Sequence, residues 1–206
     1  RCAESRALTA AAACPVASEH AGSRATDSLS LPAWLVIVNP AAGRSRRDAR
    51  AWSAMEQALR QAGVAHDVAW TTGPGDGARI AAAAWQQGRA RFLVAGGDGS
   101  VHDVVNGLMT AQRAHDAPAS PEPPRLPTLV PLPLGTGNDW SRSLALPGDP
   151  AALAALIRRD HAVSHDVGRI EFPASGTTPA RTCWFINVAG AGFDAHVIER
   201  MPARTP

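Results

Sequence analysis

Residues 92–108, FLVAGGDGSVHDVVNGL, join three patterns without a gap. The first four residues are continuously apolar, which is typical of a buried strand in a parallel sheet. From Ser100 onward the apolar residues recur at helical spacing, and Ser100 itself is a suitable N-cap for that helix. This stretch therefore predicts a strand, a glycine-rich turn and the start of a helix.

The turn, Gly96-Gly97-Asp98-Gly99, predicts a phosphate-binding loop. Glycines let main-chain N–H groups come close to an anion, and the first turn of the helix adds free donors and partial positive charge. Asp98 is explained if it binds Mg²⁺ or the hydroxyl that attacks a phosphate. The alternative is a tight strand-to-helix turn in which Asp98 is only a second capping residue.

The composition is that of a globular protein, and it excludes two classes of kinase. The chain has 206 residues, of which 45% are hydrophobic and 18% charged, and its formal net charge is only +2. This balance does not favour nucleic acid as a partner. All 20 basic residues are arginine. Intact P-loop NTPases and protein kinases are excluded because both need a phosphate-binding lysine.

No apolar run in the sequence reaches the roughly 18 residues that a membrane span requires. The three cysteines, Cys2, Cys14 and Cys183, are far apart, which favours a reducing compartment over a disulfide framework. We therefore expect a cytoplasmic protein without a transmembrane segment, which meets the inner face of a membrane peripherally if at all.

Strand and helix patterns alternate along the middle of the chain. Apolar strands are expected at 34–38, 92–95 and 128–132, and an alternating strand at 64–70; helical patterns lie between them. Asp76 and Asp149 are expected as helix N-caps, and Gly63 as a C-terminal stop. This order predicts an α/β fold with a mostly parallel sheet and helices on both faces.

The loops after these strands carry the polar and glycine-rich segments NPAAG, TTGPG, GGDGS and LGTGND. Because parallel strands end at the same edge of a sheet, we expect the loops to meet there, where open α/β sheets bind ligands.

Three regions are expected along the chain. Residues 1–30 read as a disordered extension, and residues 31–160 as a nucleotide-binding α/β domain. Residues 161–206 look like the first strands of an antiparallel, β-rich second domain, too short to close a sheet. The proline-rich segment 117–127 is expected to be an extended surface linker.

NPAAG, GGDGSVHDVVNGL and PLGTGNDWSRSL, in this order, resemble the catalytic domain of the diacylglycerol kinase and sphingosine kinase family, which includes bacterial lipid kinases. NAD kinases share a GGDG-type loop, but LGTGND followed by SRSL favours the lipid-kinase branch. The segment FINVAGAGFDAHV, residues 185–197, resembles the entry into the β-rich second domain of these proteins. The resemblance implies a fold like that of NAD kinases and diacylglycerol kinases.

The resemblance also implies ATP-dependent transfer of the γ-phosphoryl group to a lipid hydroxyl at a membrane surface, with Mg²⁺. Asp98 would orient the metal or the attacking hydroxyl, and Asn106, Asn138 and Asp139 would support the site; Asp139 is equally well explained as a helix cap. The residues expected to contact ATP are Asn39, Pro40, Ala41, Ala42, Gly43, Thr71, Gly96, Gly97, Asp98, Gly99, Ser100, Val101, His102, Gly135 and Thr136.

The sequence departs from the family pattern at Ser100, where threonine is usual, and at Asp103, where glutamate is usual. The general base of the family, in a DGE-like segment, is expected beyond residue 206. Two alternatives therefore stay open: a non-catalytic nucleotide-binding module, and a soluble-substrate kinase of the NAD kinase type. The sequence predicts neither the acceptor lipid nor an oligomeric state.

Overall fold

The computed structural model describes residues 6–11, 33–42, 46–115, 126–190, 196 and 200. Within these residues, seven strands form a sheet of order β3-β2-β4-β5-β1-β6-β7. The strands are β1 (Arg6–Ala11), β2 (Trp34–Val38), β3 (His66–Trp70), β4 (Arg91–Gly96), β5 (Thr128–Pro133), β6 (Ala162–Phe172) and β7 (Arg181–Phe185). The helices are α1 (Arg46–Gln61), α2 (Asp76–Gln86), α3 (Asp98–His115), α4 (Asp139–Ser143) and α5 (Pro150–Arg158).

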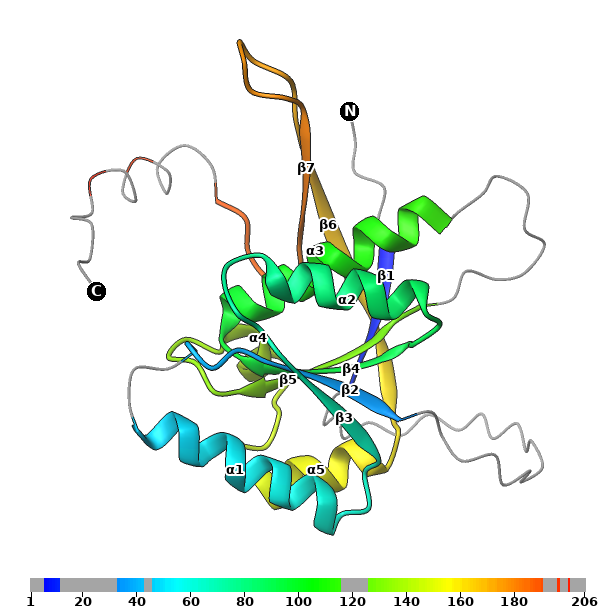
Figure 1. Ribbon diagram of the computed structural model, residues 1–206, viewed down its shortest axis with the longest axis vertical. Helices are drawn as coiled ribbons and strands as arrows, with labels where there is room; N and C mark the ends of the chain where they lie inside the picture. The colour runs from blue at the N-terminus through cyan, green and yellow to red at the C-terminus, as the bar shows by residue number, and fades with distance from the viewer. Residues whose placement is uncertain are drawn as a thin grey trace.

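Strands β3, β2, β4 and β5 run parallel, and helices cover both faces of this part of the sheet (Figure 1). Alternate side chains of the buried strands point to opposite faces. Ile37 and Val94 belong to the core beneath α2 and α3, whereas Val36 and Leu93 belong to the core beneath α1 and α5. The predicted parallel α/β fold is confirmed.

One predicted helix N-cap is confirmed in this pair of helices, and the other is wrong. Asp149 caps α5 by accepting the N–H of Ala152 at 2.8 Å, as expected. Ser100, by contrast, is not an N-cap: α3 begins at Asp98, and the Gly97 carbonyl accepts the N–H of Ser100 at 3.0 Å. The spacing of apolar residues correctly predicted which face of this helix is buried, but it did not predict the residue at which the helix begins.

Asp76 is also not an N-cap, because it is the first residue of α2. The N-cap is Gly75, whose φ of 75° lies in the left-handed region that glycine enters without steric cost. The carboxylate of Asp76 is therefore free to bond to the loop that precedes the helix.

The expectation of a disordered extension over residues 1–30 is wrong for residues 6–11, which form β1. This strand pairs in parallel with β5 and antiparallel with β6. Its sequence, RALTAA, has no alternation that marks a strand. Main-chain ladders on both sides place it in the sheet, and a local pattern does not report such long-range pairing. Residues 1–5 and 12–30 lie outside the described residues.

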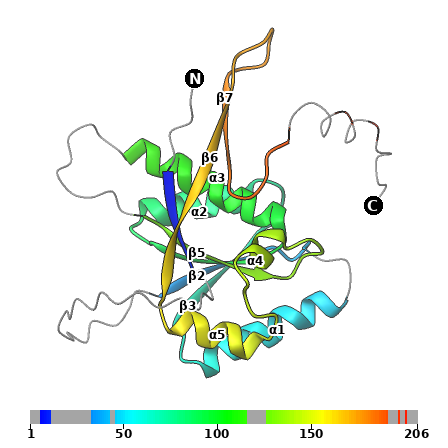
Figure 2. The ribbon, with the colours of Figure 1, turned by 180° about the vertical axis from the view of Figure 1, so that it is seen from behind.

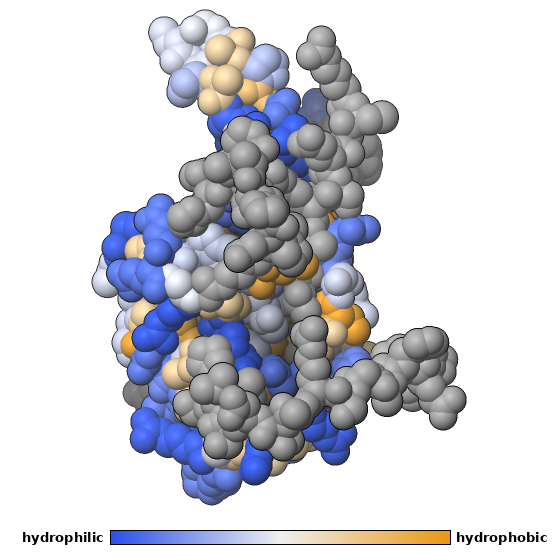
Figure 3. Space-filling view, turned by 90° about the vertical axis from the view of Figure 1, so that its right-hand side faces the viewer, coloured by the Kyte–Doolittle hydropathy of each residue, from blue (hydrophilic) through white to orange (hydrophobic). Residues whose placement is uncertain are grey.

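Strand β6 joins two pairings. Residues 162–167 pair with β1, and residues 168–172 pair with β7. The β6–β7 hairpin stands out from the body of the molecule (Figures 1 and 2). Its tip mixes hydrophilic and hydrophobic residues (Figure 3). The antiparallel pair agrees with the expected start of a β-rich unit, and the boundary at residue 161 remains a prediction. Residues 116–125, most of the expected linker, lie outside the described residues.

Helices α2 and α3 approach each other closely at Gly107. A Cβ atom there would overlap the carbonyl oxygen of Ala78 and would lie 2.7 Å from its Cα. Replacing glycine with alanine inside a helix normally stabilises it by about 1 kcal/mol. We expect Gly107→Ala instead to lower the free energy of unfolding by about 1–3 kcal/mol, because the helices must move apart. Urea unfolding beside Gly148→Ala, a site with open space around it, checks this; a gain in stability would contradict it.

Candidate active site

The predicted loops meet at the carboxyl edge of the parallel strands. Three of the four loops begin with a main-chain hydrogen bond to the neighbouring strand. Asn39 donates to the Ala95 carbonyl at 2.9 Å, and Thr71 donates to the Val38 carbonyl at 2.9 Å. Leu134 donates to the Gly96 carbonyl at 3.1 Å. The pattern of hydrogen bonds between the strands therefore continues into the first residue of these three loops.

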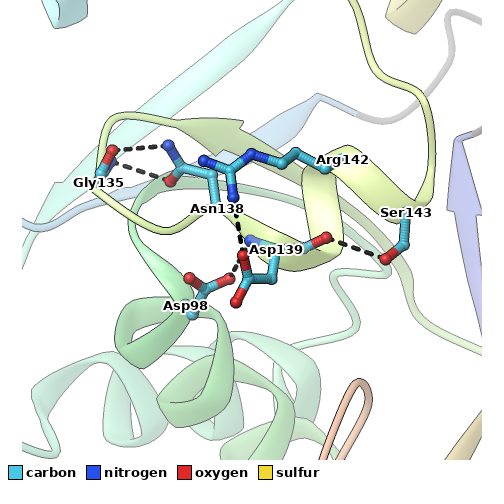
Figure 4. Close-up of polar contacts among 6 residues, drawn as sticks. All are labelled: Asp98, Gly135, Asn138, Asp139, Arg142 and Ser143. Carbon is cyan, nitrogen blue, oxygen red and sulfur yellow. Dashed lines mark hydrogen bonds and ion pairs between the residues drawn. The ribbon is translucent and has the colours of Figure 1, made fainter.

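The GGDG and LGTGND loops touch through their main chains. A Cβ atom on Gly135 would overlap the Cα of Gly97, so no side chain fits there. Asn138 has a left-handed φ of 56°, and its carboxamide turns back onto Gly135 (Figure 4). It accepts the Gly135 N–H at 3.1 Å and donates to the Gly135 carbonyl at 2.6 Å. Asn138 thus holds the second loop in the shape that reaches Gly97.

Two carboxylates lie beside this contact. Asp98 Oδ1 accepts the main-chain N–H of Asp139 at 2.9 Å (Figure 4). A Cβ atom on Gly137 would lie 2.5 Å from Asp98 Oδ2 and 4.0 Å from Asp139 Oδ2, so both carboxylates border this glycine. Asp139 also forms an exposed ion pair with Arg142 at 2.9 Å. The N-cap of α4 is Asn138, so the interpretation of Asp139 as the cap is wrong.

A first cavity of about 240 Å³ opens between the loops after β2 and β3 and the beginning of α3. Asn39 links its two sides by donating from Nδ2 to the Ser100 hydroxyl at 2.9 Å, while its Oδ1 accepts the Ala41 N–H at 2.9 Å. The lining residues are Ile37, Asn39, Pro40, Ala41, Thr71, Thr72, Gly73, Pro74, Gly77, Ser100, Asp103 and Val104.

The TTGPG loop is held in place by two carboxylates. Asp76 Oδ2 accepts both the N–H and the hydroxyl of Thr72, at 2.9 and 3.0 Å, and Asp76 Oδ1 accepts from Arg79 Nε at 2.8 Å. Asp103 Oδ2 accepts the Gly75 N–H at 3.3 Å. The main-chain bond from Thr72, with help from Arg79, lowers the pKa of Asp76 below its ordinary value. Asp76 is therefore ionised at neutral pH and stays a firm acceptor.

A second cavity of about 340 Å³ lies against the other side of the same helix turn. Its lining residues are Asp98, Gly99, Val101, His102, Asp139, Trp140, Phe185, Ile186, Asn187 and Val188. At 3.6 residues per turn, positions 98, 101 and 102 of α3 face away from positions 100, 103 and 104, which line the first cavity. The beginning of α3 is therefore a wall shared by two cavities.

The residues expected to contact ATP are divided by this wall. Those that line the first cavity are Asn39, Pro40, Ala41, Thr71 and Ser100. Those that line the second are Asp98, Gly99, Val101 and His102. Asp98 thus lies beside Asp139 and not among Asn39 and Thr71.

The other expected residues have different places. Gly96 ends β4, where a Cβ atom would overlap the Ser100 hydroxyl. Ala42 closes a turn by donating to the Asn39 carbonyl at 3.1 Å. Thr136 is exposed and lines neither cavity. Gly43 lies outside the described residues.

Sequence reasoning missed several residues of both cavities. Thr72 was left out of the expected ATP contacts, although its four-residue spacing from Asp76 at the start of a helical pattern was a usable signal. Residues 185–188 line the second cavity from β7 onward, and no local pattern links them to α3. Asn106, expected to support the site, contacts the main chain of Trp184 in β7.

Asp98 and Asp139 supply carboxylate oxygens of the kind that Mg²⁺ prefers. Among the described residues, no group of three or more histidine, cysteine, aspartate or glutamate side chains is placed to hold a metal ion. A Mg²⁺ ion held by these two carboxylates would have coordination positions left for phosphate oxygens. None of the helices in the described residues combines the length and the hydrophobicity that a bilayer span requires.

Residues 33–170 match the family model of the diacylglycerol kinase catalytic domain. A protein of Chromohalobacter salexigens named "Probable lipid kinase YegS-like" is 34% identical over 145 residues, which cover 70% of this chain and 40% of that protein. A protein of Staphylococcus haemolyticus named "Diacylglycerol kinase" is 30% identical over 146 residues, covering 71% of this chain and 38% of that protein.

A solved structure described as a diacylglycerol kinase from Bacillus anthracis str. Sterne aligns with a TM-score of 0.52 and 28% identity, over 72% of this chain and 45% of that one. This chain thus spans less than half the length of each of these three proteins. The resemblance carried by NPAAG, GGDGSVHDVVNGL and PLGTGNDWSRSL is confirmed. The family model covers more than half of the chain, so the chain belongs to the diacylglycerol kinase catalytic domain family.

Proposed function

We propose that this chain is the nucleotide-binding part of a lipid kinase, which transfers the γ-phosphoryl group of ATP to a lipid hydroxyl. The observation that carries the proposal is that two cavities of different chemistry share the first turn of α3. One side of the α3 N-terminus offers the hydroxyls of Thr71 and Ser100, and the other offers a pair of carboxylates. A phosphoryl donor and an acceptor hydroxyl need such adjoining, chemically different sites.

The first cavity suits the phosphates of a nucleotide. Thr71 and Ser100 bring hydroxyl groups to it, and the N-terminus of α3 adds partial positive charge. Asp103 would repel phosphate and could accept a sugar hydroxyl instead. The phosphates would therefore lie near Asn39 and Ser100, and the nucleoside nearer Asp103.

The second cavity suits an acceptor that has a polar head and an apolar body. Asp98 and Asp139 stand at its polar end, and Trp140, Phe185 and Val188 line the rest. Val188 is 80% exposed, which leaves an apolar side chain at the surface beside the cavity. Such an opening fits a lipid presented by a membrane surface, and we propose peripheral action there from the cytoplasm.

Within this proposal, Asp98 would orient the attacking hydroxyl, or hold Mg²⁺ together with Asp139. Mg²⁺ held there would supply positive charge where the phosphoryl group is transferred. The residues of the chain would position the two substrates and exclude water, which is the main source of catalysis in phosphoryl transfer.

The test is phosphoryl transfer from radiolabelled ATP to extracted lipids, measured with the whole protein. We expect label in the lipid fraction. We also expect ATP with Mg²⁺ to raise the melting temperature, because a ligand at 100 times its Kd stabilises the folded state by about 2.7 kcal/mol.

Thr72→Val should reduce the rise in melting temperature, because valine loses the bond to Asp76 that shapes the loop at the first cavity. Thr110→Val on the exposed side of α3 should not. ATP binding without any transfer would favour the nucleotide-binding module. Phosphorylation of NAD would favour a kinase of the NAD kinase type.

A further inference from the structure

Asn106, near the middle of α3, is bonded to both main-chain groups of Trp184 in β7. Its Nδ2 donates to the Trp184 carbonyl at 2.8 Å, and its Oδ1 accepts the Trp184 N–H at 2.8 Å. Nδ2 also donates to the His102 carbonyl at 2.8 Å, one turn earlier in α3. These bonds match those that two paired residues exchange in an antiparallel ladder. One side chain of α3 therefore takes the place of a neighbouring strand for Trp184.

The anchored residue lies directly before one wall of the second cavity. Trp184 is 1% exposed, and residues 185–188 after it line the cavity. The opposite wall begins at Asp98, eight residues before Asn106 on the same helix, or about 12 Å along its axis. The same helix thus carries both Asp98, on one wall of the cavity, and Asn106, which holds the segment that forms the other wall.

We propose that Asn106 is a positioning residue that sets the separation between the two walls of the second cavity. It would therefore govern use of the acceptor while leaving nucleotide binding unchanged. The inference rests on the proposed function, in which this cavity receives the acceptor lipid. The first cavity is bounded by Ser100, Asp103 and Val104 and by the loops after β2 and β3. Asn106 does not line it, so we expect its shape not to depend on the bonds between Asn106 and Trp184.

The first experiment compares Asn106→Ala and Asn106→Asp with Thr110→Ala, an exposed position one turn further along α3. Alanine removes both bonds to Trp184. Aspartate keeps the acceptor for the Trp184 N–H but turns a second oxygen toward the Trp184 carbonyl, which repels it. For both variants we expect kcat over KM for the lipid to fall about tenfold or more. KM for ATP should stay within about twofold of the wild-type value, and Thr110→Ala should leave both parameters unchanged.

The second experiment measures hydrogen exchange of residues 181–188 in the absence of any substrate. We expect faster exchange in Asn106→Ala than in the wild type and Thr110→Ala, because the Trp184 N–H loses its acceptor. Unchanged exchange, or unchanged lipid kinetics, would overturn the proposal. An equal loss of ATP affinity would also overturn it, because that result means a general loss of structure. If the wild-type protein phosphorylates no lipid, the proposed function fails. Hydrogen exchange alone then tests whether Asn106 holds residues 181–188 in place.

Discussion

Asp98→Asn is expected to lower kcat for phosphoryl transfer by about 10²–10⁴-fold while the fold and ATP binding persist. Asparagine keeps an oxygen at the place where Asp98 Oδ1 accepts the Asp139 N–H, so the contact between the two loops remains possible. The negative charge that would orient a hydroxyl or hold Mg²⁺ is lost. The measurement is transfer of radiolabel from ATP to lipid, made beside a thermal shift with ATP.

The matched control is Asp149→Asn at the N-terminus of α5. Asp149 also accepts one main-chain N–H, that of Ala152 at 2.8 Å, and asparagine caps helices about as well as aspartate. We expect full activity from this variant. Full activity of Asp98→Asn would remove the role proposed for that carboxylate. A loss of ATP binding in Asp98→Asn would instead place Asp98 in the nucleotide site, despite its position in the second cavity.

Much of the fold could be predicted because its signals are short-range. The buried parallel strands are continuous apolar runs, and the helices between them show regular spacing. Once the strands are parallel, their order along the chain places the following loops at one edge. The contacts of Asn39, Thr71 and Leu134 with neighbouring strands follow from this arrangement.

The division of the site into two cavities could not be predicted, because it depends on where α3 begins. With Ser100 as the N-cap, Asp98 would lie in a loop and could face the centre of the edge. In the structure Asp98 is already helical, so its direction is fixed at two residues, or about 200°, from that of Ser100. A shift of two residues in a helix start thus moves the carboxylate from one cavity to the other.

Long-range main-chain pairing is the other part that local patterns do not reveal. Strand β1 owes its place to ladders with β5 and β6, and its own sequence has little strand character. The bonds between Asn106 and Trp184 join residues 78 positions apart. Neither the pairing of β1 nor the bonds of Asn106 produces a periodic pattern in the sequence, so only the three-dimensional structure reveals them.

Gly135→Ala is expected to reduce phosphoryl transfer at least about 100-fold, since a misplacement of about 1 Å at a catalytic site costs that much. The added Cβ would overlap the Cα of Gly97, a main-chain atom that no side-chain rotation can move aside. Two hydrogen bonds from Asn138 keep Gly135 from moving away from Gly97. The GGDG loop must therefore move instead, and Asp98 moves with it. The free energy of unfolding should fall by about 1–3 kcal/mol.

Gly148→Ala separates this effect of Gly135→Ala from the general effect of replacing a loop glycine. A Cβ atom on Gly148 would meet nothing within 4 Å, and the residue lies outside both cavities. We expect this control to keep wild-type activity and stability in the same transfer assay and urea unfolding experiment. The first cavity does not include Gly135, so Gly135→Ala should reduce ATP binding less than transfer. Normal transfer by Gly135→Ala would mean that the two loops can separate without cost, and that their contact does not position Asp98.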